Sequence, residues 1–233
     1  MFWNLSAINS LLFPPNCLVC NSPGSKLCLK CQAPWNLPIT KVWFQPKILL
    51  HYQVEYGEKV NPIILAAKES NDLFAQKFLA ECFVKSIKLL RTENDFEKIF
   101  MVPIPSRKSN ERRRGYSHLK QILRFTQNHI SNVEVLPLLK IIKPIIDQTS
   151  LSAKARISNL QNAYSCDLKL LKRNQSKMNF SHNRIVVVDD LVTTGASVKE
   201  AMRALNMENI PVSAVICAAA TLRHNRLTYE ANS

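Results

Sequence analysis

The 233-residue sequence predicts an α/β protein with a mainly parallel sheet flanked by helices and a small N-terminal cysteine module. Continuous apolar runs, such as residues 185–188, are typical of strands that are buried on both faces of a parallel sheet. These runs alternate with helical patterns, which is the order found in α/β folds. The apolar content of 46% suffices for a hydrophobic core. No apolar run approaches the roughly 18 residues needed to span a membrane.

The expected elements follow from the spacing of apolar residues along the chain. Residues 71–91 repeat apolar side chains at intervals of three and four, and Ser70, Asn71 or Asp72 can cap this helix. Residues 99–104 form an apolar run that leads into a proline-flanked loop. We expect strands at residues 49–55, 99–104, 133–136, 185–188 and 212–219, and helices at residues 71–91, 116–129 and 196–206.

Four cysteines form two CxxC pairs separated by seven residues: Cys17, Cys20, Cys28 and Cys31. Two such pairs can complete a tetrahedral sulfur shell, and this spacing predicts a structural zinc site with no position left for a substrate. The N-terminus is a poor signal peptide, which favours metal binding over disulfides. Two disulfides, free thiols or an iron–sulfur cluster are the alternatives. We expect residues 1–46 to form this module and its linker, and residues 47–233 to form a second domain.

The net charge of +14 predicts an anionic partner. Residues 101–130 carry seven basic residues and one acidic residue, and residues 166–184 carry five basic residues and one acidic residue. A solvated surface is the ordinary interpretation of such segments. Phosphate binding is the sharper hypothesis for the first segment, and DNA binding is the hypothesis for the second.

Residues 184–197, RIVVVDDLVTTGAS, carry the strongest functional signal. An apolar strand ends at Asp189 and Asp190, and a hydroxyl-rich turn with Gly195 leads directly into a helix. Free amides at a helix N-terminus attract phosphate, and glycine lets the backbone approach its oxygens closely. The two acids could accept hydrogen bonds from vicinal sugar hydroxyls or help to hold a hydrated Mg²⁺. The pattern indicates a sugar-phosphate site, and an ordinary strand–turn–helix is the alternative.

This stretch resembles the phosphoribosyl pyrophosphate loop of the type I phosphoribosyltransferases over the whole length of that motif. The resemblance implies a domain of that fold, with Asp189 and Asp190 as the catalytic pair that contacts the ribose hydroxyls. It also implies Mg²⁺ bound with the ligand. The residues implied to bind phosphoribosyl pyrophosphate in this loop are Val192, Thr193, Thr194, Gly195, Ala196 and Ser197.

Further motifs make the chain look like the ComF family, the competence-associated phosphoribosyltransferase-like proteins of bacteria. They are the cysteine module, Lys68, residues 102–106, residues 112–116, Asp147-Gln148, Leu151, Arg156, Asn159 and Ala163-Tyr164. This resemblance runs from about Cys17 to Ala220 and implies a cytoplasmic protein that handles DNA taken up in natural transformation. One departure is that Ser117-His118 stands where the family usually has Asn-Gln. We interpret His118 as a surface or packing residue rather than an acid–base group.

The loop after residue 104 is expected to face the same sheet edge as Asp189, and there it would bind pyrophosphate. Pro105 and Ser106 end the strand, and the basic run that includes Arg113 and Arg114 would neutralise the pyrophosphate charge. A solvated helix start or a nucleic-acid patch is the alternative for this run.

Two functions from different classes fit these observations. The first is an enzyme that transfers the phosphoribosyl group to an acceptor, with Mg²⁺ and arginines stabilising the leaving pyrophosphate, in DNA uptake or in nucleotide metabolism. The second is a non-catalytic, nucleotide-regulated module that binds single-stranded DNA or a DNA-uptake helicase. In that case Trp35, Trp43 and Tyr116 could stack on bases.

Overall fold

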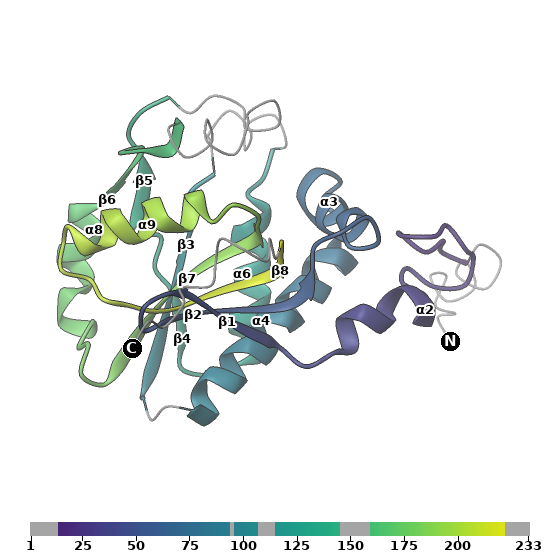
Figure 1. Ribbon diagram of the computed structural model, residues 1–233, viewed down its shortest axis with the longest axis horizontal. Coiled ribbons are helices and arrows are strands. Elements are labelled where there is room, and N and C mark those ends of the chain that lie inside the picture. Colours follow the sequence, from purple (N-terminus) through teal and green to yellow (C-terminus); the bar gives the residue numbers. More distant parts are fainter. Residues whose placement is uncertain (1–13, 94–95, 107–114, 145–158, 222–233) are drawn as a thin grey trace, which may run out of the picture.

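The computed structural model describes residues 14–93, 96–106, 115–144 and 159–221 (Figure 1). It confirms a mixed α/β fold around a six-stranded sheet with the order β1-β2-β8-β7-β3-β4. Five neighbouring strands of this sheet are parallel, in the order β2, β8, β7, β3 and β4. The edge strand β1 is antiparallel to β2. Two further strands, β5 and β6, form a small antiparallel pair. The bounds are β1 (Thr40–Gln45), β2 (Ile48–Glu55), β3 (Lys98–Pro103), β4 (Val133–Val135), β5 (Leu139–Ile141), β6 (Tyr164–Cys166), β7 (Asn183–Val192) and β8 (Val212–Ala220).

Helices cover both faces of the large sheet, because successive residues of a strand point to opposite sides. In β7, Val186 and Val188 pack with α3, α4 and α6, whereas Ile185 and Val187 pack with α9 and the β5–β6 pair. In Figure 1, α9 lies in front of the sheet, with α4 and α6 behind it. None of the described helices is long and apolar enough to cross a membrane. The helices are α2 (Leu29–Gln32), α3 (Asn61–Glu69), α4 (Leu73–Glu93), α6 (His118–His129), α8 (Leu168–Asn174) and α9 (Ala196–Asn206), with 3₁₀ turns η1 (Ala33–Asn36) and η3 (Gln175–Lys177).

The strands and helices predicted from the sequence are all present, and β7 is longer than predicted. Its apolar run ends at Val188, yet the strand continues through both aspartates to Val192. The reason is that β8 continues to pair with it, with Asp189 opposite Cys217 and Val192 opposite Ala220. The ladder therefore overrides the low strand propensity of two adjacent aspartates.

The segment predicted as a linker before Pro46 contains the edge strand β1 instead. Half of its side chains are exposed and only Phe44 is buried, so no clear period-two pattern marks this strand in the sequence. It is held by antiparallel pairing with β2, in which Thr40 lies opposite Tyr52.

The cysteine segment packs onto the same core as α3 and α4. Trp35 in η1 is 1% exposed, and its ring meets that of Phe78 edge to face, with 5.1 Å between centroids. Burial of such a large ring is worth roughly 2–3 kcal/mol. The segment is therefore attached to the main body by apolar contacts and does not stand apart from it.

Candidate functional site

The end of β7, a bend and the start of α9 form the centre of the candidate site. Gly195 is the N-cap of α9 and has a left-handed backbone, with φ of 70° and ψ of 4°. Glycine adopts this conformation without steric cost, so it permits the immediate change from strand to helix. The N–H groups in the first turn of α9 have no partner within the helix and can bind an anion. Thr193, Thr194 and Ser197 lie partly exposed around this bend.

The two aspartates at the end of β7 differ in exposure, although their carboxyl groups lie close enough to hydrogen-bond to each other. Asp190 is 5% exposed, and its Oδ2 lies 2.9 Å from Nε2 of His118 at the start of α6. Asp189 is only partly buried, and its Oδ1 accepts a hydrogen bond of 2.9 Å from the backbone N–H of Asp190. The carboxylate available at this edge is therefore that of Asp189.

The surroundings of the two carboxyl groups move their pKa values in opposite directions. Burial alone would raise the pKa of Asp190, but the charge and hydrogen bond of His118 outweigh it and hold this pKa well below its usual range. Burial, together with the negative charge of Asp190, raises the pKa of Asp189 well above its usual value. The positive charge of Lys68 at the end of α3 acts to lower the pKa of both groups, but at Asp189 it does not outweigh burial and the charge of Asp190. Asp190 thus has the lower pKa of the pair.

Tyr116 fixes the chain just before α6 against the turn between α3 and α4. Its hydroxyl donates to the carbonyl of Lys68 at 2.8 Å and accepts from the backbone N–H of Asn71 at 2.7 Å. Asn71 has a left-handed backbone, with φ of 53°, and its side chain accepts a hydrogen bond from Gln76. These contacts place His118 at the inner end of α6, facing Asp190.

The end of β3 lies beside the end of β7, as the sequence predicted. Pro103 is opposite Val188, and the N–H of Ile104 donates to the carbonyl of Val188 at 3.0 Å. Pro105 and Ser106 therefore follow β3 at the same sheet edge as Asp189. Arg113 and Arg114 lie outside the described residues, as do Gln148 and Arg156.

The four cysteines of the N-terminal segment form a compact cluster in which all four sulfur atoms lie within 4.8 Å of one another. Cys20 Sγ and Cys28 Sγ are 3.7 Å apart, and the thiols are not joined by disulfides. Zinc–sulfur bonds of about 2.3 Å in a tetrahedron imply sulfur–sulfur distances of roughly 3.8 Å, which this pair matches. The residues therefore fit a zinc ion, which would be enclosed by protein on all four sides.

Local contacts prepare part of this cluster for the thiolate form that a metal requires. Although burial acts in the other direction, hydrogen bonds from nearby backbone N–H groups lower the pKa of Cys17 to about 6. The N–H of Cys28 lies 3.5 Å from Cys17 Sγ. By contrast, burial raises the pKa of the Cys31 thiol to about 12. A bound cation would stabilise the thiolate that burial disfavours at Cys31.

The aromatic residues predicted as stacking platforms differ in their exposure. Trp35 is buried against Phe78, so its expected role in stacking on bases is wrong. Trp43 on β1 is 53% exposed, and Tyr116 is bound through its hydroxyl to the α3–α4 turn. Trp43 is therefore the most exposed of the three aromatic residues.

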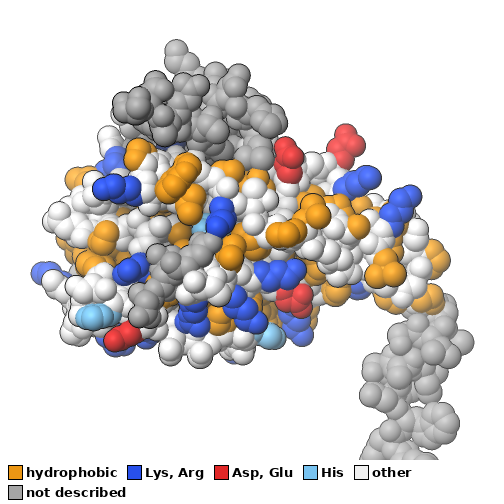
Figure 2. Space-filling model, turned by 60° about the horizontal axis from the view of Figure 1, so that its bottom comes forward, with side chains coloured by type: hydrophobic (Ala, Val, Ile, Leu, Met, Phe, Trp, Pro, Cys, Tyr) orange, Lys and Arg blue, Asp and Glu red, His pale blue; other side chains and the backbone are white. Residues whose placement is uncertain are grey.

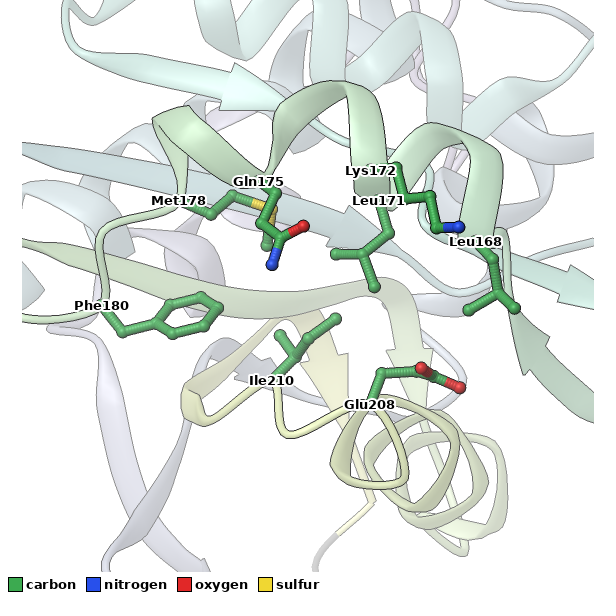
Figure 3. A pocket seen from close by; sticks show the side chains of 8 residues that line it. All are labelled: Leu168, Leu171, Lys172, Gln175, Met178, Phe180, Glu208 and Ile210. Atoms are coloured by element: carbon green, nitrogen blue, oxygen red, sulfur yellow. The ribbon is translucent and has the colours of Figure 1, made fainter.

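A separate pocket of about 350 Å³ lies beside α8 and η3, at the end of the sheet where β7 and β8 begin (Figure 3). In Figure 3 the side chains of Leu171, Phe180 and Ile210 point toward one another across it. No predicted site residue lines this pocket. Its lining consists of Leu168, Leu171, Lys172, Gln175, Met178, Phe180, Glu208 and Ile210.

The pairing of His118 with Asp190 is a feature that sequence reasoning missed. The residues are 72 positions apart, and no local pattern connects them. One signal was present in the sequence: Ser117-His118 stands where ComF-like sequences usually have Asn-Gln after the Arg-Gly-aromatic triplet. This departure puts the ionisable His118 where an amide side chain is usual.

These features define a class of protein: a mostly parallel α/β domain with an acidic strand end, a glycine bend into a helix and an attached four-cysteine cluster. A comparison with models of known protein families finds no match. The chain is 26% identical over 174 residues to Competence protein F of Haemophilus influenzae. The aligned region covers 73% of this chain and 71% of that protein. This similarity supports membership of the ComF family, as the motifs predicted.

Proposed function

We propose that the protein binds phosphoribosyl pyrophosphate at the end of β7, in a competence-related role. The observation that carries this proposal is the left-handed Gly195, which brings the partly buried Asp189 at a strand end and a helix N-terminus into one site. The 5′-phosphate would lie in the bend of residues 192–197, where amides and the hydroxyls of Thr193, Thr194 and Ser197 can donate to it. The similarity to Competence protein F supports the link to DNA uptake.

The other parts of the ligand follow from this placement. Asp189 would accept a hydrogen bond from a ribose hydroxyl. The pyrophosphate would extend toward Pro105 and Ser106 after β3, where Arg113 and Arg114 are proposed to neutralise its charge. Mg²⁺ would bind with the ligand and help to neutralise the pyrophosphate. The proposed setting is the cytoplasm, where thiols stay reduced and can hold zinc.

The proposed reaction is phosphoribosyl transfer, in which the anomeric C–O bond to pyrophosphate breaks and an acceptor forms the new bond at that carbon. The test combines calorimetry with a release assay. We expect wild-type protein to bind phosphoribosyl pyrophosphate with Mg²⁺, and Asp189→Asn to lose at least about tenfold in affinity, because one carboxyl oxygen that can accept from a ribose hydroxyl becomes an amide nitrogen that can only donate. Undiminished affinity in Asp189→Asn would contradict the site.

A panel of bases and single-stranded DNA oligonucleotides then tests transfer. Steady pyrophosphate release with one acceptor identifies an enzyme and its acceptor class. Tight binding without release from any acceptor identifies a non-catalytic module that responds to the nucleotide.

A second candidate function is single-stranded DNA binding, which the exposed basic residues of α8 and η3 favour. Lys169, Lys172, Arg173 and Lys177 are all exposed on this segment. On the face in Figure 2, basic side chains are spread over the surface with few acidic ones among them, rather than gathered in one strip. Contacts to phosphates would make binding fall steeply as salt rises, so fluorescence anisotropy across a salt series tests this function. Binding that is independent of salt would argue against it.

A further inference from the structure

His118 and Asp190 form a buried pair beneath the candidate site. Their side chains are 6% and 7% exposed, and Nε2 of His118 lies 2.9 Å from Oδ2 of Asp190. A buried carboxylate without a partner would be costly, and this contact supplies the partner. The contact therefore determines where the Asp190 side chain lies.

His118 is itself held from both sides along the chain. Tyr116, two residues earlier, is anchored by its hydroxyl to Lys68 and Asn71. His118 begins α6, whose buried residues pack against α4 in the main core. The imidazole thus belongs to a part of the molecule that hydrogen bonds and core packing hold in place. A shorter side chain at position 118 would therefore lose its contact with Asp190.

The position of Asp190 affects Asp189 through two short-range contacts. The backbone N–H of Asp190 donates to Oδ1 of Asp189, which fixes one oxygen of that carboxyl group. The negative charge of Asp190 beside it also acts on the ionisation of Asp189. If the Asp190 side chain turned outward, its charge and its side-chain hydrogen bond to Asp189 would change at the open end of β7, while the backbone hydrogen bond would stay.

We propose that His118 is a positioning residue that holds Asp190 inside the protein, so that Asp189 alone of the two acids contacts the ligand. This inference rests on the proposed phosphoribosyl pyrophosphate site and narrows it. One carboxyl group, that of Asp189, contacts the ligand sugar. Asp190 affects the sugar only through Asp189. Both acids had been expected from the sequence to contact the sugar.

The test uses two amide substitutions that differ in length by one methylene. In His118→Gln, the amide nitrogen can occupy the place of the imidazole Nε2 and can donate to Asp190. In His118→Asn, the amide nitrogen reaches only the place of Nδ1, which has no hydrogen-bond partner among the residues that the structure describes. We expect the glutamine variant to bind phosphoribosyl pyrophosphate with Mg²⁺ within about threefold of wild type, and the asparagine variant to lose about tenfold or more.

Asp190→Asn completes the experiment, alone and combined with His118→Asn. If His118 acts through Asp190, the double variant loses little more affinity than either single variant, because the same contact is removed only once. Circular dichroism and thermal unfolding identify variants that fold, and the affinities are compared below their melting temperatures. A purely structural role would lower stability in both amide variants without separating their affinities.

Two results overturn the inference: equal affinities of the glutamine and asparagine variants, or losses of the two single variants that add up in the double variant. Additive losses would mean that Asp190 acts on the ligand independently of His118. Failure of the wild-type protein to bind is a different result, because it overturns the proposed function itself.

Discussion

Lys26 and Asp72 form an ion pair that joins the cysteine segment to the start of α4, with 2.6 Å between Lys26 Nζ and Asp72 Oδ2. Asp72 Oδ1 also accepts a hydrogen bond of 2.9 Å from the N–H of Ala75 and so caps the helix. Although burial acts to raise it, these contacts hold the pKa of Asp72 below its usual value. The turn that anchors Tyr116 is thus held from the cysteine segment as well.

Substitutions of these two residues should differ in their cost. Lys26→Met removes only a partly exposed ion pair and should lower the free energy of unfolding by about 0–1 kcal/mol. Asp72→Ala removes both the ion pair and the helix cap. Loss of the cap should lower the free energy of unfolding by about 1 kcal/mol more. Urea unfolding measures both. Equal losses in the two variants would mean that the cap contributes nothing.

Purified protein should hold about one zinc ion per chain, because the four sulfurs complete one tetrahedral shell. Cys20→Ser should lower the zinc content and the melting temperature, since a hydroxyl is a poor zinc ligand. Cys82→Ala is the matched control, because Cys82 lies in the core of α4, outside the cluster, and should keep the metal. Metal analysis and thermal unfolding provide the measurements, and a Cys20→Ser protein with full zinc content would refute the assignment.

Much of the fold could be predicted because most of its central strands are continuous apolar runs in the sequence. Residues 185–188 and 214–219 are buried, and the helix periodicity of α4 is regular. α3 was missed because Pro62 interrupts the pattern, although proline is well tolerated in the first turn of a helix. α8 was missed because it is short and strongly basic, and its cap by Asp167 is visible only with the structure.

The candidate site divides in the same way between local and distant signals. The bend at Gly195 could be predicted, since strand, turn and helix follow one another in the chain. The inward position of Asp190 could not, because His118 comes from another element that only the tertiary fold brings close. Alternation along β7 predicts that the two acids diverge, but it does not say which of them is buried.

Gly195→Ala should weaken the proposed ligand binding at the bend of residues 192–197 more than it weakens the fold. An alanine at a φ of 70° is strained by about 1–2 kcal/mol, which would shift the backbone of this bend. Gly57→Ala is the matched control, since an added Cβ there meets no atom within 4 Å and its backbone is not left-handed. We expect affinity for phosphoribosyl pyrophosphate to fall at least about tenfold in the first variant and to stay unchanged in the second. Calorimetry on both variants decides the matter.

Glu200 connects α9 to β6 of the small antiparallel pair. Its buried carboxylate accepts from Nε and Nη2 of Arg203, each at 2.8 Å, and from the N–H of Tyr164 at 3.0 Å. Arg203 in turn donates to the carbonyl of Tyr164. Burial alone would raise the pKa of Glu200, but these bonds outweigh it and hold the pKa below the usual value of 4.5.

Glu200→Gln should therefore lower stability at neutral pH, and the loss should disappear in acid. A carboxylate whose pKa is lower in the folded chain than in the unfolded chain stabilises the fold fully above the unfolded value. That stabilisation is lost as the pH falls from 4.5 through the lower folded value. We expect a difference of about 1.5–3 kcal/mol between wild type and variant at pH 7, from charge-assisted hydrogen bonds. Urea unfolding at pH 7 and pH 3 tests this, with Lys199→Gln on the exposed side of α9 as the control. A difference that stayed constant between the two pH values would show that the charge of Glu200 has no part in holding α9 to β6.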